Sequence, residues 1–334
     1  MSILSGREFG QKYQDRTFIK LTNEKENHNG YQFQTGLNVD SIQFNSKSSC
    51  QPGGIYFCEL DKLPMWLEYD AQTMVYTRSV TIPDNAQVYE EEDKFKADRM
   101  ILGKRRKIRE LLIWDNEKYC LEAVKQNGHA LEYIRNQMEA ICLSAVKHNG
   151  YALLYVRNQT EAVCLAAVKQ NGLALQYVRN QTEEICLEAV KQNVWALQYV
   201  KNQTEEICMA AVNQDSLALK FVENQTEAIC LEAVKQNDWE LKYVKNQTEE
   251  ICMAAVKQNG QALQFVRNQT EAICLEAVKQ DGLALQYVWD QTEEICMEAV
   301  KKNGFALKYV MNQTEVICLE AVKENSKALK FVSK

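Results

Sequence analysis

Apolar and polar residues follow a fixed 22-residue pattern over the last two thirds of the chain. Each period begins at a cysteine, with Ala and Val three and four positions later, Leu at eleven, Tyr or Phe at thirteen, and Val or Ile at fourteen. These cysteines are Cys120, Cys142, Cys164, Cys186, Cys208, Cys230, Cys252, Cys274, Cys296 and Cys318. Because a constant period of about 20–50 residues is the signature of stacked repeats, the pattern predicts an array of ten units.

The first half of a repeat has helical spacing. Ile185, Cys186 and Val190 fall on one face of a helix, since residues three to five positions apart lie on the same side. Asn180 or Thr182 would cap its start by accepting hydrogen bonds from the free N–H groups of the first turn. We therefore expect a helix of about 11 residues at this place in every repeat.

The second half of a repeat predicts a shorter helix. Asn or Asp fills the place before it in all ten repeats and Gly follows in six, as in Asn171-Gly172. Both residue types tolerate the left-handed backbone that closes a helix, so we expect the first helix to end there. Ala174, Leu175 and Tyr177 then lie at helical spacing on a second helix of about seven residues.

One continuous helix is the alternative, because 22 residues make two 11-residue periods. Two observations speak against a continuous helix. A glycine in every second period would cost about 1 kcal/mol in a helix interior, and Asn-Gln-Thr recurs at the place where the hairpin needs its second break. The sequence thus predicts a mainly α fold, a right-handed α-solenoid of ten helix-turn-helix repeats preceded by a small α+β domain. The expected divisions are residues 1–103 for that domain, 104–119 for a junction or capping helix, and 120–334 for the solenoid.

The N-terminal region has a different pattern, with short runs rich in β-branched and aromatic residues. We expect strands over Phe18–Leu21, Tyr31–Phe33, Ile55–Phe57, Val75–Ile82 and Met100–Leu102. Turn clusters separate them, including Asn27-His28-Asn29-Gly30 and Gln51-Pro52-Gly53-Gly54. A short helix is expected over Asp61–Glu68, despite Pro64.

Composition and charge narrow the function classes. The chain is 46% hydrophobic and 25% charged, which is typical of a globular protein and excludes a collagen or a disordered chain. No apolar run approaches the roughly 20 residues of a membrane span, and the first residues lack the pattern of a secretory leader. The net charge of −6 disfavours a nucleic-acid-binding surface.

The cysteines suggest packing rather than chemistry. There is no Cys-x-x-Cys pair and there are three histidines in all, so a local zinc site cannot be assembled. Cα atoms of cysteines in neighbouring repeats would lie about 9–10 Å apart, the distance between packed helices and too far for a disulfide. We therefore expect small buried side chains, no metal, no cofactor and a reducing compartment.

A binding surface is suggested by the position nine residues after each cysteine, which varies while its surroundings do not. Either these residues are half-buried against the nearby Tyr or Phe, or they form a recognition ridge. The candidate partner-binding residues are Tyr151, Trp195, Trp239 and Phe305 at this position, together with Trp289, which replaces the usual Arg or Lys six positions further on. Large aromatic side chains often anchor interfaces.

Two further interpretations involve nucleic acid or the nucleus. A reader of one RNA base per repeat also presents stacking aromatics, but the negative charge and the lack of a variable polar pair speak against it. The basic run from Lys104 to Arg109 is either a nuclear address or the solvated face of the junction helix.

Two stretches carry a resemblance to known proteins. The N-terminal segment FIKLTNEKENHNGYQFQTGLNVDSIQFNSKSSCQPGGIYF resembles a module of ankyrin and other repeat proteins from giant, mimivirus-like DNA viruses. The unit ICLEAVKQNGLALQYVRNQ is similar to an uncharacterised helical repeat of the same viruses and some bacteria. The resemblance implies a viral repeat protein expressed in a host cell, and it implies no activity. Its expected location is the host cytoplasm, because the cysteines favour a reducing compartment, with the nucleus as the alternative that the basic run offers.

The favoured function is a non-enzymatic scaffold that binds a host or viral protein along the solenoid. Two alternatives stay open. The order of a His, a Gly-Gly-Ile-Tyr-Phe strand and a further extended strand resembles ADP-ribosyltransferase-like folds, with His28 and Tyr56 as the matching pair and no counterpart of the catalytic Glu. The rod could also be a self-associating structural particle component or a nucleic-acid-associated one.

Overall fold

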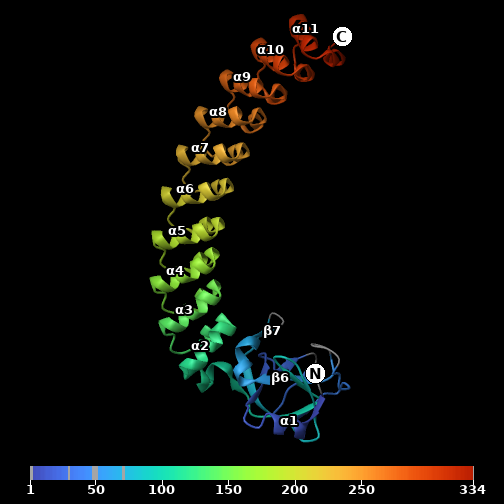
Figure 1. Ribbon diagram of the computed structural model, residues 1–334, viewed down its shortest axis with the longest axis vertical. Helices are drawn as coiled ribbons and strands as arrows, with labels where there is room; N and C mark the ends of the chain where they lie inside the picture. The colour runs from blue at the N-terminus through green and yellow to red at the C-terminus, as the bar shows by residue number, and fades with distance from the viewer. Residues whose placement is uncertain (1–2, 29–30, 47–51, 70–71, 334) are drawn as a thin grey trace. The chain divides into compact units, whose positions relative to one another are not determined.

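The structure, a computed structural model, describes residues 3–28, 31–46, 52–69 and 72–333. The chain forms two compact units, Met1–Gln170 and Asn171–Lys334. The first unit holds a sheet domain and the first helices of the array, whereas the second consists of repeats alone (Figure 1). The predicted boundary after residue 103 is therefore not where the compact units divide.

Within the described residues, the first unit contains a nine-stranded sheet whose neighbouring strands are all antiparallel. In spatial order the strands are β1 (Ile3–Ser5), β10 (Gln87–Glu90), β11 (Phe95–Ala97), β6 (Ile55–Glu59), β2 (Phe18–Thr22), β9 (Tyr76–Thr81), β12 (Arg99–Leu102) and β5 (Gly36–Val39), with β13 (Arg106–Lys107) paired to β9. Separate hairpins are formed by β3 (Asn27–His28) with β4 (Tyr31–Gln32), and by β7 (Glu68–Tyr69) with β8 (Gln72–Thr73).

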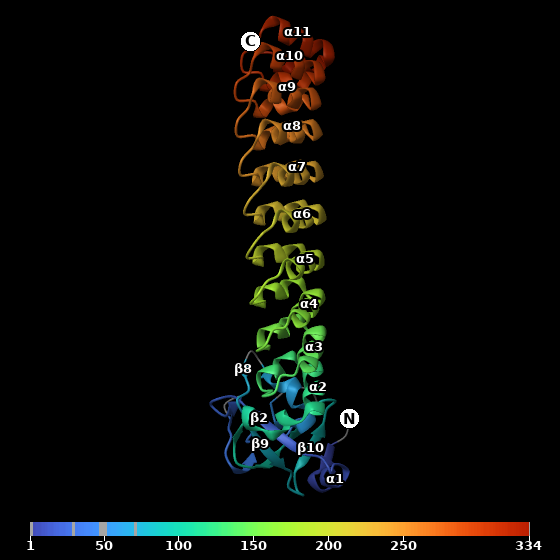
Figure 2. The ribbon, with the colours of Figure 1, turned by 90° about the vertical axis from the view of Figure 1, so that its left-hand side faces the viewer.

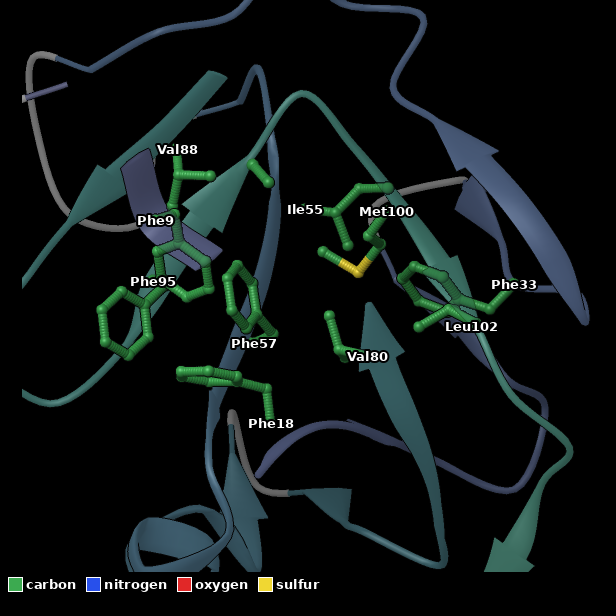
Figure 3. Close-up of a cluster of buried hydrophobic side chains, with 11 residues drawn as sticks. Phe9, Phe18, Phe33, Ile55, Phe57, Val80, Val88, Phe95, Met100 and Leu102 are labelled. Carbon is green, nitrogen blue, oxygen red and sulfur yellow. The ribbon is translucent and has the colours of Figure 1, made fainter. Parts of the chain in front are cut away.

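Phenylalanines form the core of the sheet domain (Figure 3). Helix α1 (Gly6–Lys12) starts at a capping box and packs Phe9 against the sheet. The ring of Phe9 meets the edge of Phe95 at 5.3 Å between centroids, and Phe95 stacks on Phe57 at 5.4 Å. Because alternate residues of a strand face the same side, β6 and β11 each direct a phenylalanine into this cluster.

The expected strands of this domain correspond to β2, β4, β6, β9 and β12. The expected short helix is present as a 3-10 helix, η1 (Leu60–Trp66), with Pro64 inside it. The other elements were not expected: helix α1 and strands β1, β3, β5, β7, β8, β10, β11 and β13, of which β3 occupies part of the predicted turn cluster at Asn27-His28. Of the two turn clusters, Asn29, Gly30 and Gln51 lie outside the described residues.

The predicted helix over residues 104–119 is wrong. The segment forms β13, two short 3-10 helices, η2 (Ile108–Glu110) and η3 (Leu112–Asp115), and the start of α2 (Glu117–Gln126). The extended backbone of Leu111 interrupts it and lets Ile108 and Trp114 both turn inward, where both are buried. The indole N–H of Trp114 donates to the carbonyl of Ile108 at 2.9 Å. The ring of Trp114 stacks on Tyr133 at 5.6 Å, so this segment covers the first repeat without being a helix.

Each later repeat consists of a ten-residue α-helix and a short 3-10 helix, which confirms the predicted helical repeats. The α-helices after α2 are α3 (Glu139–His148), α4 (Glu161–Gln170), α5 (Glu183–Gln192), α6 (Glu205–Gln214), α7 (Glu227–Gln236), α8 (Glu249–Gln258), α9 (Glu271–Gln280), α10 (Glu293–Lys302) and α11 (Glu315–Glu324). The 3-10 helices are η4 (Gly128–Glu132), η5 (Gly150–Tyr155), η6 (Gly172–Tyr177), η7 (Val194–Tyr199), η8 (Ser216–Phe221), η9 (Asp238–Tyr243), η10 (Gly260–Phe265), η11 (Gly282–Tyr287), η12 (Gly304–Tyr309) and η13 (Ser326–Phe331).

The caps of these helices differ in part from the prediction. Thr182, and not Asn180, caps α5, because its hydroxyl accepts from the N–H of Ile185. Asn171 does not adopt the expected left-handed conformation; its backbone is extended, with φ −151° and ψ 111°. Its side chain instead accepts from the N–H of Leu173 at 3.0 Å, and so begins the 3-10 helix.

The glycine after this Asn lies at a close approach between repeats and not in a left-handed backbone. A Cβ added to Gly172 would lie 2.3 Å from the carbonyl oxygen of Ala189 on the next α-helix. The same approach recurs at Gly260, Gly282 and Gly304. Successive α-helices of the second unit lie side by side, and so do successive 3-10 helices (Figures 1 and 2). The right-handedness of the array stays a prediction.

Candidate functional site

A glutamine amide joins each repeat of the second unit to the next. The side chain of Gln247 donates to the carbonyls of Leu241 at 3.1 Å and Phe265 at 2.9 Å. Its oxygen accepts from the backbone N–H of Arg267 at 2.8 Å and from the thiol of Cys252 at 3.8 Å. One amide thus uses both its donors and both its acceptor sites, and it holds the ends of two 3-10 helices together.

This arrangement, the glutamine clamp, repeats along the unit. The glutamines that donate to the carbonyl of the Tyr or Phe in the following repeat are Gln181, Gln203, Gln225, Gln247, Gln269, Gln291 and Gln313. Sequence reasoning treated Asn-Gln-Thr only as a break between helices and missed the role of the glutamine. Its recurrence at one place in every repeat, next to a backbone turn, is the signal that could have revealed it.

The cysteines lie in the core of the array, as expected. Cys186, Cys208, Cys230 and Cys274 are buried, and burial raises the pKa of each of these thiols to about 11. Thiolates, which are the reactive form, are therefore scarce at neutral pH. Within residues 3–28, 31–46, 52–69 and 72–333, no group of three or more His, Cys, Asp and Glu side chains is placed to hold a metal ion.

The aromatic residues at position nine of the second unit pack on the aromatic ring of the following repeat. Trp195 is half-buried and meets the edge of Phe221 at 5.5 Å, while Trp239 lies tilted against Phe265 at 5.3 Å. Trp239 nevertheless stays 49% exposed. These side chains therefore support the stack with one face and are open to solvent with the rest.

The other candidates lie elsewhere. Phe305 is half-buried against Phe331, at 6.2 Å. Trp289 follows η11, on another row of the repeat, and is 63% exposed. Tyr151 is 36% exposed and belongs to the first unit. The structure thus places Trp195, Trp239 and Phe305 on one row of the second unit and Trp289 on another row of that unit, while Tyr151 holds the corresponding position in a repeat of the first unit.

The two N-terminal candidates come from different strands of the first unit. His28 lies on the β3–β4 hairpin and Tyr56 on strand β6 of the main sheet, two separate sheets, and the side chain of His28 lies outside the described part of the chain. In the basic run, Ile108 is buried, and Arg105 pairs with Glu26 at 3.2 Å. That carboxylate also accepts from the buried guanidinium of Arg78 at 2.9 Å.

No helix in the part of the chain that the structure describes is long and apolar enough to cross a membrane.

Curated relatives come from Acanthamoeba polyphaga mimivirus. One named as a putative ankyrin repeat protein is 31% identical over 119 residues, which are 34% of this chain and 57% of the relative. An uncharacterized protein of the same virus is 32% identical over 109 residues, 32% of this chain and 77% of the relative. Another named as a putative ankyrin repeat protein is 34% identical over 113 residues, 29% of this chain and 36% of the relative. The chain thus spans little more than half the length of the first of these relatives. The similarity to giant-virus repeat proteins is confirmed.

No solved structure matches the chain. The profile of one family matches the repeats themselves, and each match covers about two successive repeats. The matched residues are 139–182, 160–204, 182–226, 226–269 and 271–313. Because these matches together cover more than half of the sequence, the chain belongs to the family described as a domain of unknown function, DUF4116.

Proposed function

We propose that this chain is a non-enzymatic scaffold that binds a protein partner, viral or host, along the surface of its repeats. The supporting observation is the half-exposed Trp239, which the stack holds in place through Phe265. A large aromatic side chain that is already ordered loses little entropy on binding and can anchor an interface. Stacked repeats offer extended surfaces of this kind, and two of the relatives are named as ankyrin repeat proteins.

The proposed contact residues are Tyr151 in the first unit and Trp195, Trp239, Trp289 and Phe305 in the second. The proposed location is the host cytoplasm, where a reducing environment would keep the buried thiols free. Entry to the nucleus through Lys104–Arg109 is a further proposal, and the ion pair between Arg105 and Glu26 leaves the other basic residues of the run to act as an address.

Replacing Trp195 and Trp239 with Ala is expected to release the partner. The test is capture of proteins from virus-infected cell lysate by the full chain and by the variant, with quantitative mass spectrometry and circular dichroism of both proteins. The amount of captured partner should fall at least about tenfold, because each anchor residue contributes about 2 kcal/mol or more to binding. Leu319→Ala is the matched control, because it shortens a 63% exposed side chain on α11 instead of on a 3-10 helix.

An equal loss in both variants, or no loss in either, would contradict the proposal. Should the double variant unfold, Trp239→Ala alone decides, because this side chain is the more exposed of the two. Capture of further copies of the chain itself and of nothing else would favour self-association.

A further inference from the structure

Three rows of side chains form one surface of the second unit, here called the η face. It consists of the residues nine, twelve and thirteen positions after each cysteine, all on the 3-10 helices η6 to η13. Position thirteen holds a half-buried Tyr or Phe in every repeat of this unit. Position nine carries mostly Leu, Trp or Phe, which packs beside it. Position twelve is exposed and is always Gln or Lys.

The charge on the η face has one sign. Its charged residues are Lys220, Lys242, Lys308, Lys327 and Lys330, and no Asp or Glu occurs in these rows within residues 171–333. Asp238 and Glu240 of η9 lie outside the rows and are buried. The unit's exposed carboxylates include a row in the first turns of the α-helices, where they face the positive end of the helix dipole: Glu183, Glu184, Glu205, Glu206, Glu227, Glu249, Glu250, Glu271, Glu293, Glu294 and Glu315.

Four of the five lysines of the η face, Lys220, Lys242, Lys308 and Lys330, lie over aromatic rings. The ammonium of Lys220 is 4.4 Å from the ring centroid of Trp195, and that of Lys242 is 4.7 Å from Tyr243. Lys308 lies 4.4 Å from Tyr309. Each of these side chains is exposed, so its charge stays available to a ligand while its stem covers apolar surface.

We infer that the η face binds an acidic segment of a protein partner, whose carboxylates pair with these lysines and whose apolar side chains contact the aromatic rows. This inference rests on the proposed scaffold function and adds the chemistry of the partner. The combination of apolar rows and a few cations suits a peptide with mixed side chains. A nucleic acid would need a denser row of cations along its phosphates, and the unit carries many exposed carboxylates as well.

The test uses a random copolymer of glutamate and tyrosine as the probe, with binding to the full chain measured by fluorescence anisotropy at about 100 mM salt, where surface charges are only partly screened. The variant Lys220→Gln/Lys242→Gln/Lys308→Gln introduces the residue that Gln176, Gln198, Gln264 and Gln286 already supply in the same row. Its affinity should fall about tenfold, because each exposed ion pair contributes modestly.

The control, Lys235→Gln/Lys257→Gln/Lys279→Gln, removes the same charge from exposed positions on α7, α8 and α9, and its affinity should change less than about twofold. A second pair of variants adds lysines instead of removing them, so its result does not depend on whether the fold tolerates the loss of a lysine. Gln264→Lys/Gln286→Lys on the η face should tighten binding by about threefold, whereas Gln236→Lys/Gln258→Lys at the ends of α7 and α8 should not.

Absence of copolymer binding, equal effects in both pairs of variants, or tighter binding of single-stranded polyuridine would overturn the inference. If the copolymer fails to bind while the tryptophan variants still release a captured protein, the acidic chemistry is wrong and the scaffold function stands. If neither occurs, both proposals are wrong.

Discussion

Replacing Gln247 with Leu is expected to lower the free energy of unfolding of the repeats around it by about 2–3 kcal/mol. The substitution removes the hydrogen bonds of the glutamine clamp to the carbonyls of Leu241 and Phe265 and to the N–H of Arg267. Leucine keeps the approximate size of the side chain but leaves these backbone groups without their partner, and an unsatisfied buried group costs about 1–3 kcal/mol.

The measurement is urea unfolding of the full chain by circular dichroism, together with hydrogen exchange and mass spectrometry to locate the change. Exchange should rise in η9 and η10, and much less in distant repeats, because repeats contact only their neighbours. Gln264→Leu is the matched control, since this exposed amide donates to the carbonyl of Gln261 in its own helix and, within the described residues, bridges to no other repeat. Equal destabilisation by both substitutions would show that the clamp does not join the repeats.

Replacing Glu240 with Ala is expected to raise the stability of the second unit at pH 7 by about 1–3 kcal/mol. Ala fills the same position in the other nine repeats, and Ala218 and Ala262 are buried there. Glu240 is 1% exposed; one oxygen accepts from the amide of Asn237 at 3.0 Å, and within the described residues the other has no hydrogen-bond partner.

The expected gain depends on pH. Burial, with a smaller contribution from the charge of Asp215, raises the pKa of Glu240, whereas Lys242, Asn237 and Lys220 oppose the rise. When the pKa of an acid is higher in the folded chain than in the unfolded chain, the fold is more stable at low pH, where the acid is protonated, than at neutral pH. This extra stability is lost as the pH rises through the folded pKa. The advantage of Glu240→Ala should therefore be largest at pH 7, shrink as the pH falls through the raised folded pKa, and be smallest below the ordinary Glu pKa of 4.5.

Urea unfolding at pH 7 and pH 4 checks this prediction. Glu240→Gln separates charge from size, because it removes the carboxylate and keeps the volume; it should recover part of the gain at pH 7. Glu250→Gln, at an exposed first turn of α8, should instead be neutral or slightly destabilising, since a negative charge is favourable there. A stability difference that does not vary with pH would mean that crowding, and not charge, makes Glu240 costly.

The period and the buried face of the repeats could be predicted because they depend on residues close in sequence. Cys186, Ala189 and Val190 are buried at helical spacing, as expected. The role of Gly172 was misjudged, because a glycine serves either a left-handed backbone or a close approach, and the second use depends on Ala189 of the following helix. The glutamine clamp also depends on contacts between residues about twenty positions apart. It could not be predicted from the pattern of one repeat, because that pattern shows only which residues lie close in sequence.

The junction segment was mispredicted for a related reason. Its run of Ile, Leu and Trp resembles an apolar helix face, yet Ile108 and Trp114 reach the interior through two separate 3-10 turns. The 22-residue period places Trp195 and Trp239 on one row, but it does not reveal what supports them, because Phe221 and Phe265, on which they rest, belong to the following repeat.

Lysine crosslinking with mass spectrometry in virus-infected cells tests the central claim most directly, because the second unit carries lysines on two surfaces. The account predicts that partner peptides are linked to Lys220, Lys242 and Lys308 on the 3-10 helices. Links to a partner through Lys191, Lys235 and Lys257 on the α-helices instead, or no linked partner at all, would contradict it.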